Sequence, residues 1–275
     1  MMKVLAAVTF LGLLAVVPAC AGASERATGG LAGAGRRSGD ANPFQFPWQA
    51  ALLTTADQFF CGASVIGLRW LLTAGHCLDP FDELHVAVGG LSLPDGSHQH
   101  YRQTFSTRDM HQHPQFDMEY LDNDIGLVGL PADLKMTMFV KPVRLPSYSM
   151  ATEDLSGKTV SISGWGKAGE ADPSPSPVLR YTELEILPDS ECENVYGNTM
   201  LGNKMCLSAE GDSGGALVIR KDGDNLGGDK GDFIQIGITS FISVEGCTVK
   251  LPQGFTKVAS FLEFIEEITN IPIDD

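Results

Sequence analysis

Short apolar runs separated by Gly, Pro, Asp and Asn follow one another along most of the chain after Phe46. A first block contains runs at 48–53, 59–66, 70–74 and 84–88. A second block begins near Lys158 and contains runs at 159–163, 216–219 and 233–241. Such runs, bounded by turn residues, predict β-strands, and their spacing favours an all-β sandwich or barrel over alternating βαβ units.

The end of the chain has a different pattern. Residues 258–270 place Val258, Phe261, Leu262, Ile265 and Ile268 on one face at helical spacing, which predicts a closing helix. Residues 141–157 are rich in Pro and Ser and are expected to connect the two β-blocks. We therefore expect one β-unit over 40–140, a second over 158–257 and a helix over 258–270.

The N-terminal segment resembles a cleavable export signal. Its apolar run from Val4 to Val17 is shorter than the roughly 20 residues that a membrane span needs, and small residues follow at 19–23. Residues 1–21 are thus expected to be a signal peptide, and the Gly-, Ala-, Ser- and Arg-rich residues 22–39 a pro-segment. An alternative is a bacterial lipoprotein box at 17–20, which Pro18 fits poorly. Export predicts a secreted, extracellular protein without a membrane anchor once the signal is removed.

Composition narrows the function classes. The chain has 275 residues, 43% hydrophobic and 19% charged, enough to bury a core and too polar for a protein with several membrane spans. A formal net charge of −15 without a basic stripe argues against binding to nucleic acid.

No metal or cofactor is predicted. Two His-x-His pairs, at 98–100 and 111–113, lack further ligands at fixed offsets. Four aspartates between 222 and 232 are better explained as a polar hairpin tip than as a calcium loop.

Six cysteines are present, and one of them, Cys20, would leave with the signal peptide. In an exported protein the others should form disulfides. The five that remain are an odd number, so one is free, mispaired or joined to another molecule. They are Cys61, Cys77, Cys192, Cys206 and Cys247.

Three short segments carry residues suited to nucleophilic catalysis, in the chain order His, Asp, Ser. His76 lies in Thr-Ala-Gly-His-Cys, Asp124 in Asp-Asn-Asp-Ile-Gly-Leu, and Ser213 in Gly-Asp-Ser-Gly-Gly. A serine hydroxyl is a weak nucleophile at neutral pH and needs a base within hydrogen-bond reach. An imidazole titrates in the right range for that base, and a buried carboxylate can hold it in the required tautomer.

With these motifs the chain resembles the chymotrypsin/trypsin-like serine peptidases, with insect and crustacean chymotrypsin-like or collagenase-like members as the closest in character. The resemblance implies two six-stranded antiparallel β-barrels with a C-terminal helix, and an acyl-enzyme on Ser213. It assigns the oxyanion donors to the amides of Gly211 and Ser213, and the zymogen switch to Asp212. Further matching segments cover most of the chain: 46–49, 60–62, 113–114, 163–166, Ser240 and 254–258.

The resemblance also implies disulfides and a substrate pocket. Cys61–Cys77 would close the loop that carries His76, and Cys192–Cys206 would be the second bridge, with Cys206–Cys247 as a competing pairing. The chain has Ile242 and Gln253 where trypsins have glycine, so a small or apolar substrate side chain is expected. The residues assigned to the pocket are Leu207, Ser240, Phe241, Ile242 and Gln253.

Two segments depart from the family pattern. Gly35-Arg36-Arg37-Ser38 stands where an Ile-Val-Gly-Gly-like start is usual, so cleavage after Arg37 would expose a polar Ser38. The stretch from Cys206 to Ser213 is several residues shorter than usual and lacks a second Cys.

Three hypotheses follow. The first is a secreted, monomeric serine endopeptidase that acts on proteins or peptides and is open to protein inhibitors. The second is a catalytically impaired homologue that works as a binding or regulatory module. The third is an incomplete gene model or splice form.

Overall fold

The computed structural model describes residues 38–79, 81–93, 101–166, 174–197, 202–207, 215–221, 233–241 and 252–275. The predicted signal peptide and the pro-segment up to residue 37 lie outside these ranges, as do Gly211, Asp212, Ser213, Ile242 and Cys247.

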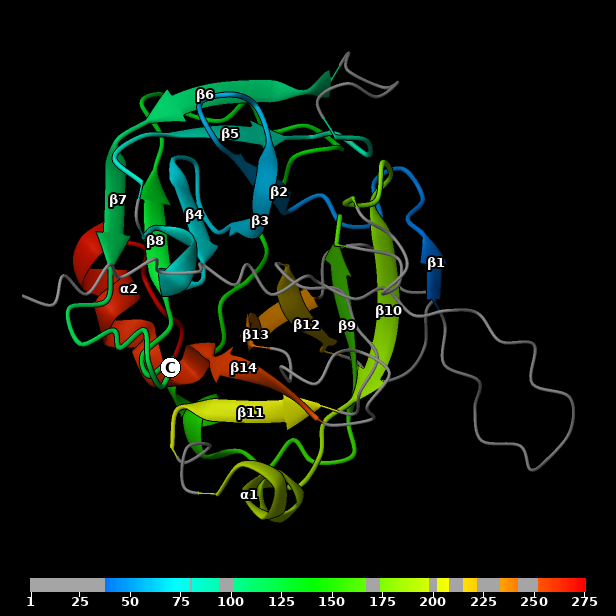
Figure 1. Ribbon diagram of the computed structural model, residues 1–275, viewed down its shortest axis with the longest axis vertical. Helices are drawn as coiled ribbons and strands as arrows, with labels where there is room; N and C mark the ends of the chain where they lie inside the picture. Colours follow the sequence, from blue (N-terminus) through cyan, green and yellow to red (C-terminus); the bar gives the residue numbers. More distant parts are fainter. Residues whose placement is uncertain are drawn as a thin grey trace, which may run out of the picture.

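The first sheet is built from strands of the first β-block and is antiparallel throughout (Figure 1). Its order is β6-β5-β2-β3-β4-β8-β7. The edge strands β6 and β7 are separated in the chain by Arg108 alone, so they are two halves of one bent strand and the sheet curls back on itself. The strands are β2 (Gln49–Leu53), β3 (Phe59–Val65), β4 (Trp70–Thr73), β5 (Leu84–Val88), β6 (Gln103–Thr107), β7 (Asp109–Gln112) and β8 (Gly126–Gly129).

The second sheet is also antiparallel, in the order β1-β10-β9-β12-β13-β14-β11. Just beyond β10, the Leu187 amide donates to the Cys206 carbonyl at 3.0 Å. The segment that follows β10 is therefore hydrogen-bonded to β11, the strand at the far edge of the same sheet. The strands are β1 (Ser38–Asp40), β9 (Thr159–Gly164), β10 (Arg180–Glu185), β11 (Lys204–Leu207), β12 (Ala216–Arg220), β13 (Phe233–Phe241) and β14 (Gln253–Lys257).

The predicted all-β architecture with a C-terminal helix is confirmed. Each sheet has seven described strands instead of six, and the difference has a local cause in each case. In the first sheet one strand is divided at Arg108. In the second, the short β1 is added through its pairing with β10, with Ser38 opposite Thr182.

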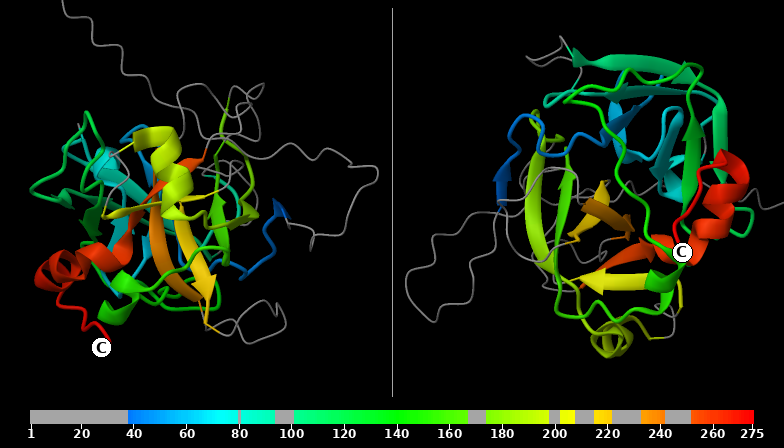
Figure 2. Two further views of the ribbon diagram at one scale, coloured as in Figure 1. Left: turned by 90° about the horizontal axis from the view of Figure 1, so that it is seen from below. Right: turned by 180° about the vertical axis from the view of Figure 1, so that it is seen from behind.

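Helical segments are few. After β14 the chain forms a 3-10 turn, η5 (Val258–Phe261), and continues as α2 (Leu262–Thr269). Figures 1 and 2 show α2 lying along β7 and β8 of the first sheet, although it follows the last strand of the second. The His113 ring packs edge-on against Phe261 and Phe264, with ring centroids 5.3 and 4.9 Å away. The other described helical segments are η1 (Gly75–Cys77), η3 (Tyr148–Thr152) and α1 (Asp189–Tyr196).

Two buried hydrogen bonds join the sheets to each other. Ser64 of β3 donates to the Gln235 side-chain oxygen of β13 at 2.6 Å. Ser163 of β9 donates to the Gln49 side-chain oxygen of β2 at 2.8 Å. Because buried polar groups are costly without partners, these pairs hold the sheets in one relative placement.

No helix in the described part of the chain is both long and apolar enough to span a bilayer.

Candidate active site

His76 lies on the 3-10 turn η1, which leaves the end of β4 and packs against the segment before β8. Gly75 makes this contact possible, since a Cβ there would lie 3.1 Å from the Ile125 carbonyl oxygen and 3.2 Å from the Ile125 nitrogen. Gly126, the first residue of β8, also allows this close approach, because a Cβ there would lie 2.5 Å from Cδ1 of Leu78, the residue that follows η1. Two glycines thus let η1 approach the residues next to Asp124.

Asp124 is fully buried and accepts two hydrogen bonds from His76. Its Oδ1 lies 2.8 Å from the His76 backbone nitrogen, and its Oδ2 lies 2.9 Å from His76 Nδ1. An ionised carboxylate can only accept, so the Nδ1 atom carries the proton and the Nε2 atom of the neutral ring keeps its lone pair. The imidazole side chain is 32% exposed while the carboxylate side chain is 0% exposed, so the ring lies between Asp124 and solvent.

Two residues of the second sheet also bind Asp124. Ser240 of β13 donates its hydroxyl to Oδ2 at 2.6 Å, and Thr256 of β14 donates to the Asp124 backbone oxygen at 2.9 Å. The sequence assigned Ser240 to the pocket and gave Thr256 no role. Their contacts depend on the register of β13 and β14, with Ile238 opposite Thr256, and no local motif contains that information.

Burial and the neighbouring Asp124 shift the pKa of His76 in opposite directions. Burial disfavours the charged ring, but the negative charge of Asp124 and the hydrogen bond to it outweigh burial and raise the pKa of His76 above its ordinary value. The pair can therefore take up a proton at Nε2 and stabilise the resulting imidazolium, which is the chemistry of a general base.

Comparison with known proteins agrees with this geometry. The family model described as Trypsin matches residues 37–265. The chain belongs to the trypsin family. The family predicted from the sequence is thus confirmed.

Relatives and solved structures support the same assignment. Brachyurin from Leptuca pugilator is 32% identical over 232 residues, which cover 84% of this chain and 97% of the relative. A chymotrypsin from Phaedon cochleariae is 32% identical over 233 residues, covering 82% and 78%. The structure of neuropsin, a serine protease expressed in the limbic system of mouse brain, superposes with a TM-score of 0.70 at 28% identity, covering 84% of this chain and 97% of that one.

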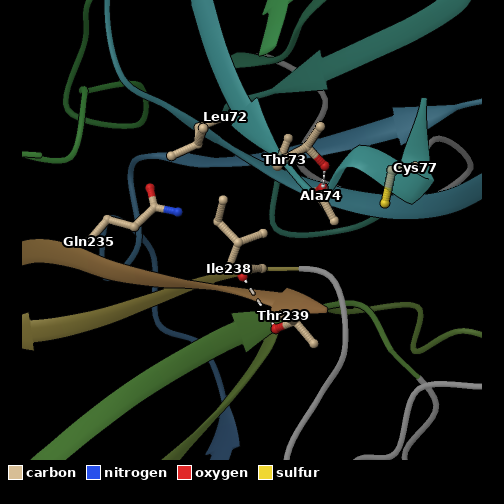
Figure 3. Close-up of a pocket in the computed structure, with 10 residues that line it drawn as sticks. Leu72, Thr73, Ala74, Cys77, Gln235, Ile238 and Thr239 are labelled. Atoms are coloured by element: carbon tan, nitrogen blue, oxygen red, sulfur yellow. Dashed lines mark hydrogen bonds between the residues drawn. The ribbon is translucent and has the colours of Figure 1, made fainter. Parts of the chain in front are cut away.

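The segment that follows Ser213 in this trypsin-family chain lies near η1. Gly215 lines a small pocket between the sheets together with Ala74 and Cys77, the residues next to Gly75 and His76 (Figure 3). In Figure 3 Leu72 and Thr73 approach this pocket from the first sheet, and Ile238 and Thr239 from the second. A Cβ on Gly215 would lie 1.7 Å from the Ser163 carbonyl oxygen, so only glycine fits against β9.

Four of the residues assigned to the substrate pocket lie in the neighbouring strands β11, β14 and β13, where Ser240 and Phe241 share β13. Leu207 of β11 is opposite Gln253 of β14, and Phe241 of β13 is opposite Gly254. Leu207 and Gln253 are buried. The side chain of Phe241 lies outside the described part of the structure.

Two disulfides occur within the described residues, and both have the pairing that the sequence favours. Cys61–Cys77 links β3 to η1 beside His76, and Cys192–Cys206 links α1 to β11. Cys206 is therefore bonded to Cys192 and not to Cys247.

The His-x-His pair at 111–113, which the sequence does not favour as a metal site, belongs to no group of potential ligands among the described residues. Cys61, His76 and Cys77 are the group of potential ligands found there, and both sulfurs are joined in a disulfide, so they offer no thiolate. His111 instead lies 2.8 Å from Asp109. His98, His100 and the aspartates of 222–232 lie outside the described ranges.

Proposed function

We propose that this chain is a secreted serine endopeptidase that hydrolyses peptide bonds through an acyl-enzyme on Ser213. The observation that carries the proposal is the buried Asp124 carboxylate holding His76 Nδ1–H at 2.9 Å, which puts the ring's lone pair on Nε2. The Nε2 atom lies 3.5 Å from Cys77 Sγ, a disulfide sulfur that has no proton to donate, so the lone pair can accept one from a substrate or nucleophile. Family membership and the position of Gly215 beside η1 support Ser213 as the nucleophile.

The proposed reaction has two halves. In the first, His76 Nε2 takes the Ser213 hydroxyl proton while Oγ attacks the peptide carbonyl carbon, and the amides of Gly211 and Ser213 donate to the oxyanion. His76 then gives the proton to the leaving amine, and the C–N bond breaks. In the second half, His76 Nε2 takes a proton from a water molecule while the water oxygen attacks the acyl carbon. His76 then gives this proton to Ser213 Oγ as the C–Oγ bond breaks, which releases a carboxylic acid and restores the serine hydroxyl.

The proposed substrates are proteins or peptides with a small or apolar side chain at the primary site. The pocket is assigned to Leu207, Ser240, Phe241, Ile242 and Gln253, and no carboxylate among them could pair with Arg or Lys. The buried Leu207 and Gln253, side by side in β11 and β14, support a pocket with little room at its base. No cofactor is required by this chemistry.

Activation is the second part of the proposal. The signal peptide directs export, and cleavage of the pro-segment frees an ammonium group that pairs with Asp212. The polar Ser38 start favours a second candidate, a homologue that keeps His76 and Asp124 but has lost activation and serves as a binding module.

Hydrolysis of fluorescently labelled casein by the exported, N-terminally sequenced protein separates these two candidates. An endopeptidase should cleave it, and His76→Gln and Ser213→Ala should each lose at least about 10³-fold in kcat. His85→Gln, which changes a half-buried histidine paired with Asp57 on the first sheet, is the matched control. Intact casein with the correctly processed protein would favour the binding module, and equal cleavage by Ser213→Ala would refute the assignment.

A further inference from the structure

Three consecutive residues next to His76 are tied to the second sheet through separate hydrogen bonds. Asp124 is held by Ser240 and Thr256, as described above. The side-chain oxygen of Asn123 accepts a hydrogen bond from the side-chain amide of Asn203 at 2.9 Å. Asp122 lies 2.6 Å from the ammonium of Lys204. The run 122–124 thus bridges the sheets at β11, β13 and β14.

Lys204 is unusual because its side chain is 2% exposed. Lysine is almost never fully buried unless its charge is paired. Its ammonium group also donates to the Tyr120 backbone oxygen at 2.9 Å, so one buried cation binds two points of the loop that leads to Asp124. Asp122 is 53% exposed, so the carboxylate of this ion pair reaches the surface while the ammonium is buried.

The loop needs such support because its backbone is strained. Leu121 has φ of 50° and Asn123 has φ of 52°, in the left-handed region that side chains disfavour. The Ile125 amide donates to the Asn123 carbonyl at 2.8 Å, so Asp124 is the central residue of a tight turn. A small rotation of this turn would move the Asp124 carboxylate relative to His76.

We propose that Lys204 and Asp122 form a positioning pair that fixes the Asp124 carboxylate on His76. The proposal rests on the proposed function, since the positioned carboxylate matters for a base at His76. Lys204 and Asp122 touch no reacting atom; they act through the loop 120–124. Loss of the pair lets the carboxylate move away, which weakens the interaction that raises the pKa of His76.

The variants separate positioning from simple stabilisation. Asp122→Asn removes the carboxylate that lies 2.6 Å from a buried ammonium, so it should lower both stability and activity. Adding Lys204→Met to it removes the buried charge and should restore stability, but the loop 120–124 still lacks its hydrogen bonds to residue 204. Asp133→Asn, which removes the carboxylate of the exposed Arg69–Asp133 pair, is the matched control.

The decisive readout is the imidazole titration of His76, followed by NMR in ¹⁵N-histidine-labelled protein and assigned with His76→Gln. In both Asp122→Asn and the double variant, the midpoint of the His76 titration should fall by roughly 0.5 pH units. This shift corresponds to an acid dissociation constant about threefold larger. The kcat for casein should fall on the order of tenfold with KM little changed, and Asp133→Asn should match wild type.

Failure of this proposal is distinguishable from failure of the proposed function. The titration can be measured in a Ser213→Ala background, where no turnover occurs, so it tests the pair even if wild type cleaves nothing. If the His76 midpoint is the same in wild type and both variants, the pair does not position Asp124. If the double variant regains activity together with stability, Lys204 and Asp122 have a structural role and the proposal is wrong.

Discussion

Asp124→Asn changes both hydrogen-bonding groups that the carboxylate presents to His76. Asp124 accepts from the His76 amide at 2.8 Å and from His76 Nδ1 at 2.9 Å. Asparagine has one oxygen and one NH₂ group. If its oxygen accepts from the His76 amide, its NH₂ group faces Nδ1, which must then accept, and the ring proton moves to Nε2. In the other orientation the NH₂ group faces the buried His76 amide, donor against donor.

Either orientation costs activity. A buried donor left without an acceptor costs about 1–3 kcal/mol, more where a charge was involved. The variant also loses the negative charge that stabilises the imidazolium, and kcat should fall by roughly 10⁴-fold, the loss that this substitution causes in the trypsin family.

The assay is kcat for casein cleavage across pH, with His85→Gln as a control that leaves both Asp124 oxygens and their hydrogen bonds intact. In wild type, activity should rise with pH through the raised pKa of His76, because the neutral ring is the base. In Asp124→Asn the charge that raises this pKa is gone while burial remains, so the pKa of His76 should fall. Any residual activity should then begin to increase at a lower pH than in wild type. A loss of less than about tenfold with an unmoved pH profile would refute the role of Asp124.

Three further predictions follow from the same contacts. Gly215→Ala should lower the free energy of unfolding by about 1–3 kcal/mol, because its Cβ would meet the Ser163 carbonyl oxygen; an unchanged urea midpoint would contradict this. Thr256→Val should be about 1 kcal/mol less stable than Thr256→Ser, which keeps the hydroxyl donor to the Asp124 carbonyl; equal midpoints would show that this hydrogen bond is dispensable. Because folding raises the pKa of His76, wild type should be more stable than His76→Gln below the unfolded-state pKa of about 6.5. This difference in the free energy of unfolding should disappear as the pH rises through the folded-state pKa. A difference that does not change with pH in denaturant titrations would be inconsistent with the raised pKa.

Much of the fold could be predicted from the sequence because its signals are local. Apolar runs between turn residues mark β2 to β5, and the 3.6-residue spacing after Val258 marks η5 and α2. The division of a strand at Arg108 and the pairing of β1 with β10 depend on contacts between distant segments. The short helix α1 has no long apolar periodicity and is defined largely by its attachment, through Cys192, to β11.

Some residues of the candidate site could likewise be predicted from local motifs, and others depend on contacts between distant segments. His76 and Asp124 could be found because each stands in a short motif, and the structure brings them together from positions 48 residues apart. Ser240 and Thr256 could not be assigned to Asp124, since that requires the register of β13 and β14. Lys204 gave no signal either, because a lysine at the start of a strand is ordinarily expected to be exposed.

The most direct test of the account is to locate the adduct that a fluorophosphonate probe forms on the folded, mature protein, using tandem mass spectrometry. If His76 and Asp124 activate Ser213 as proposed, the probe should attach to Ser213, and His76→Gln should label far more slowly. Correctly processed, folded protein that carries no adduct, or carries it on another residue, would contradict the account.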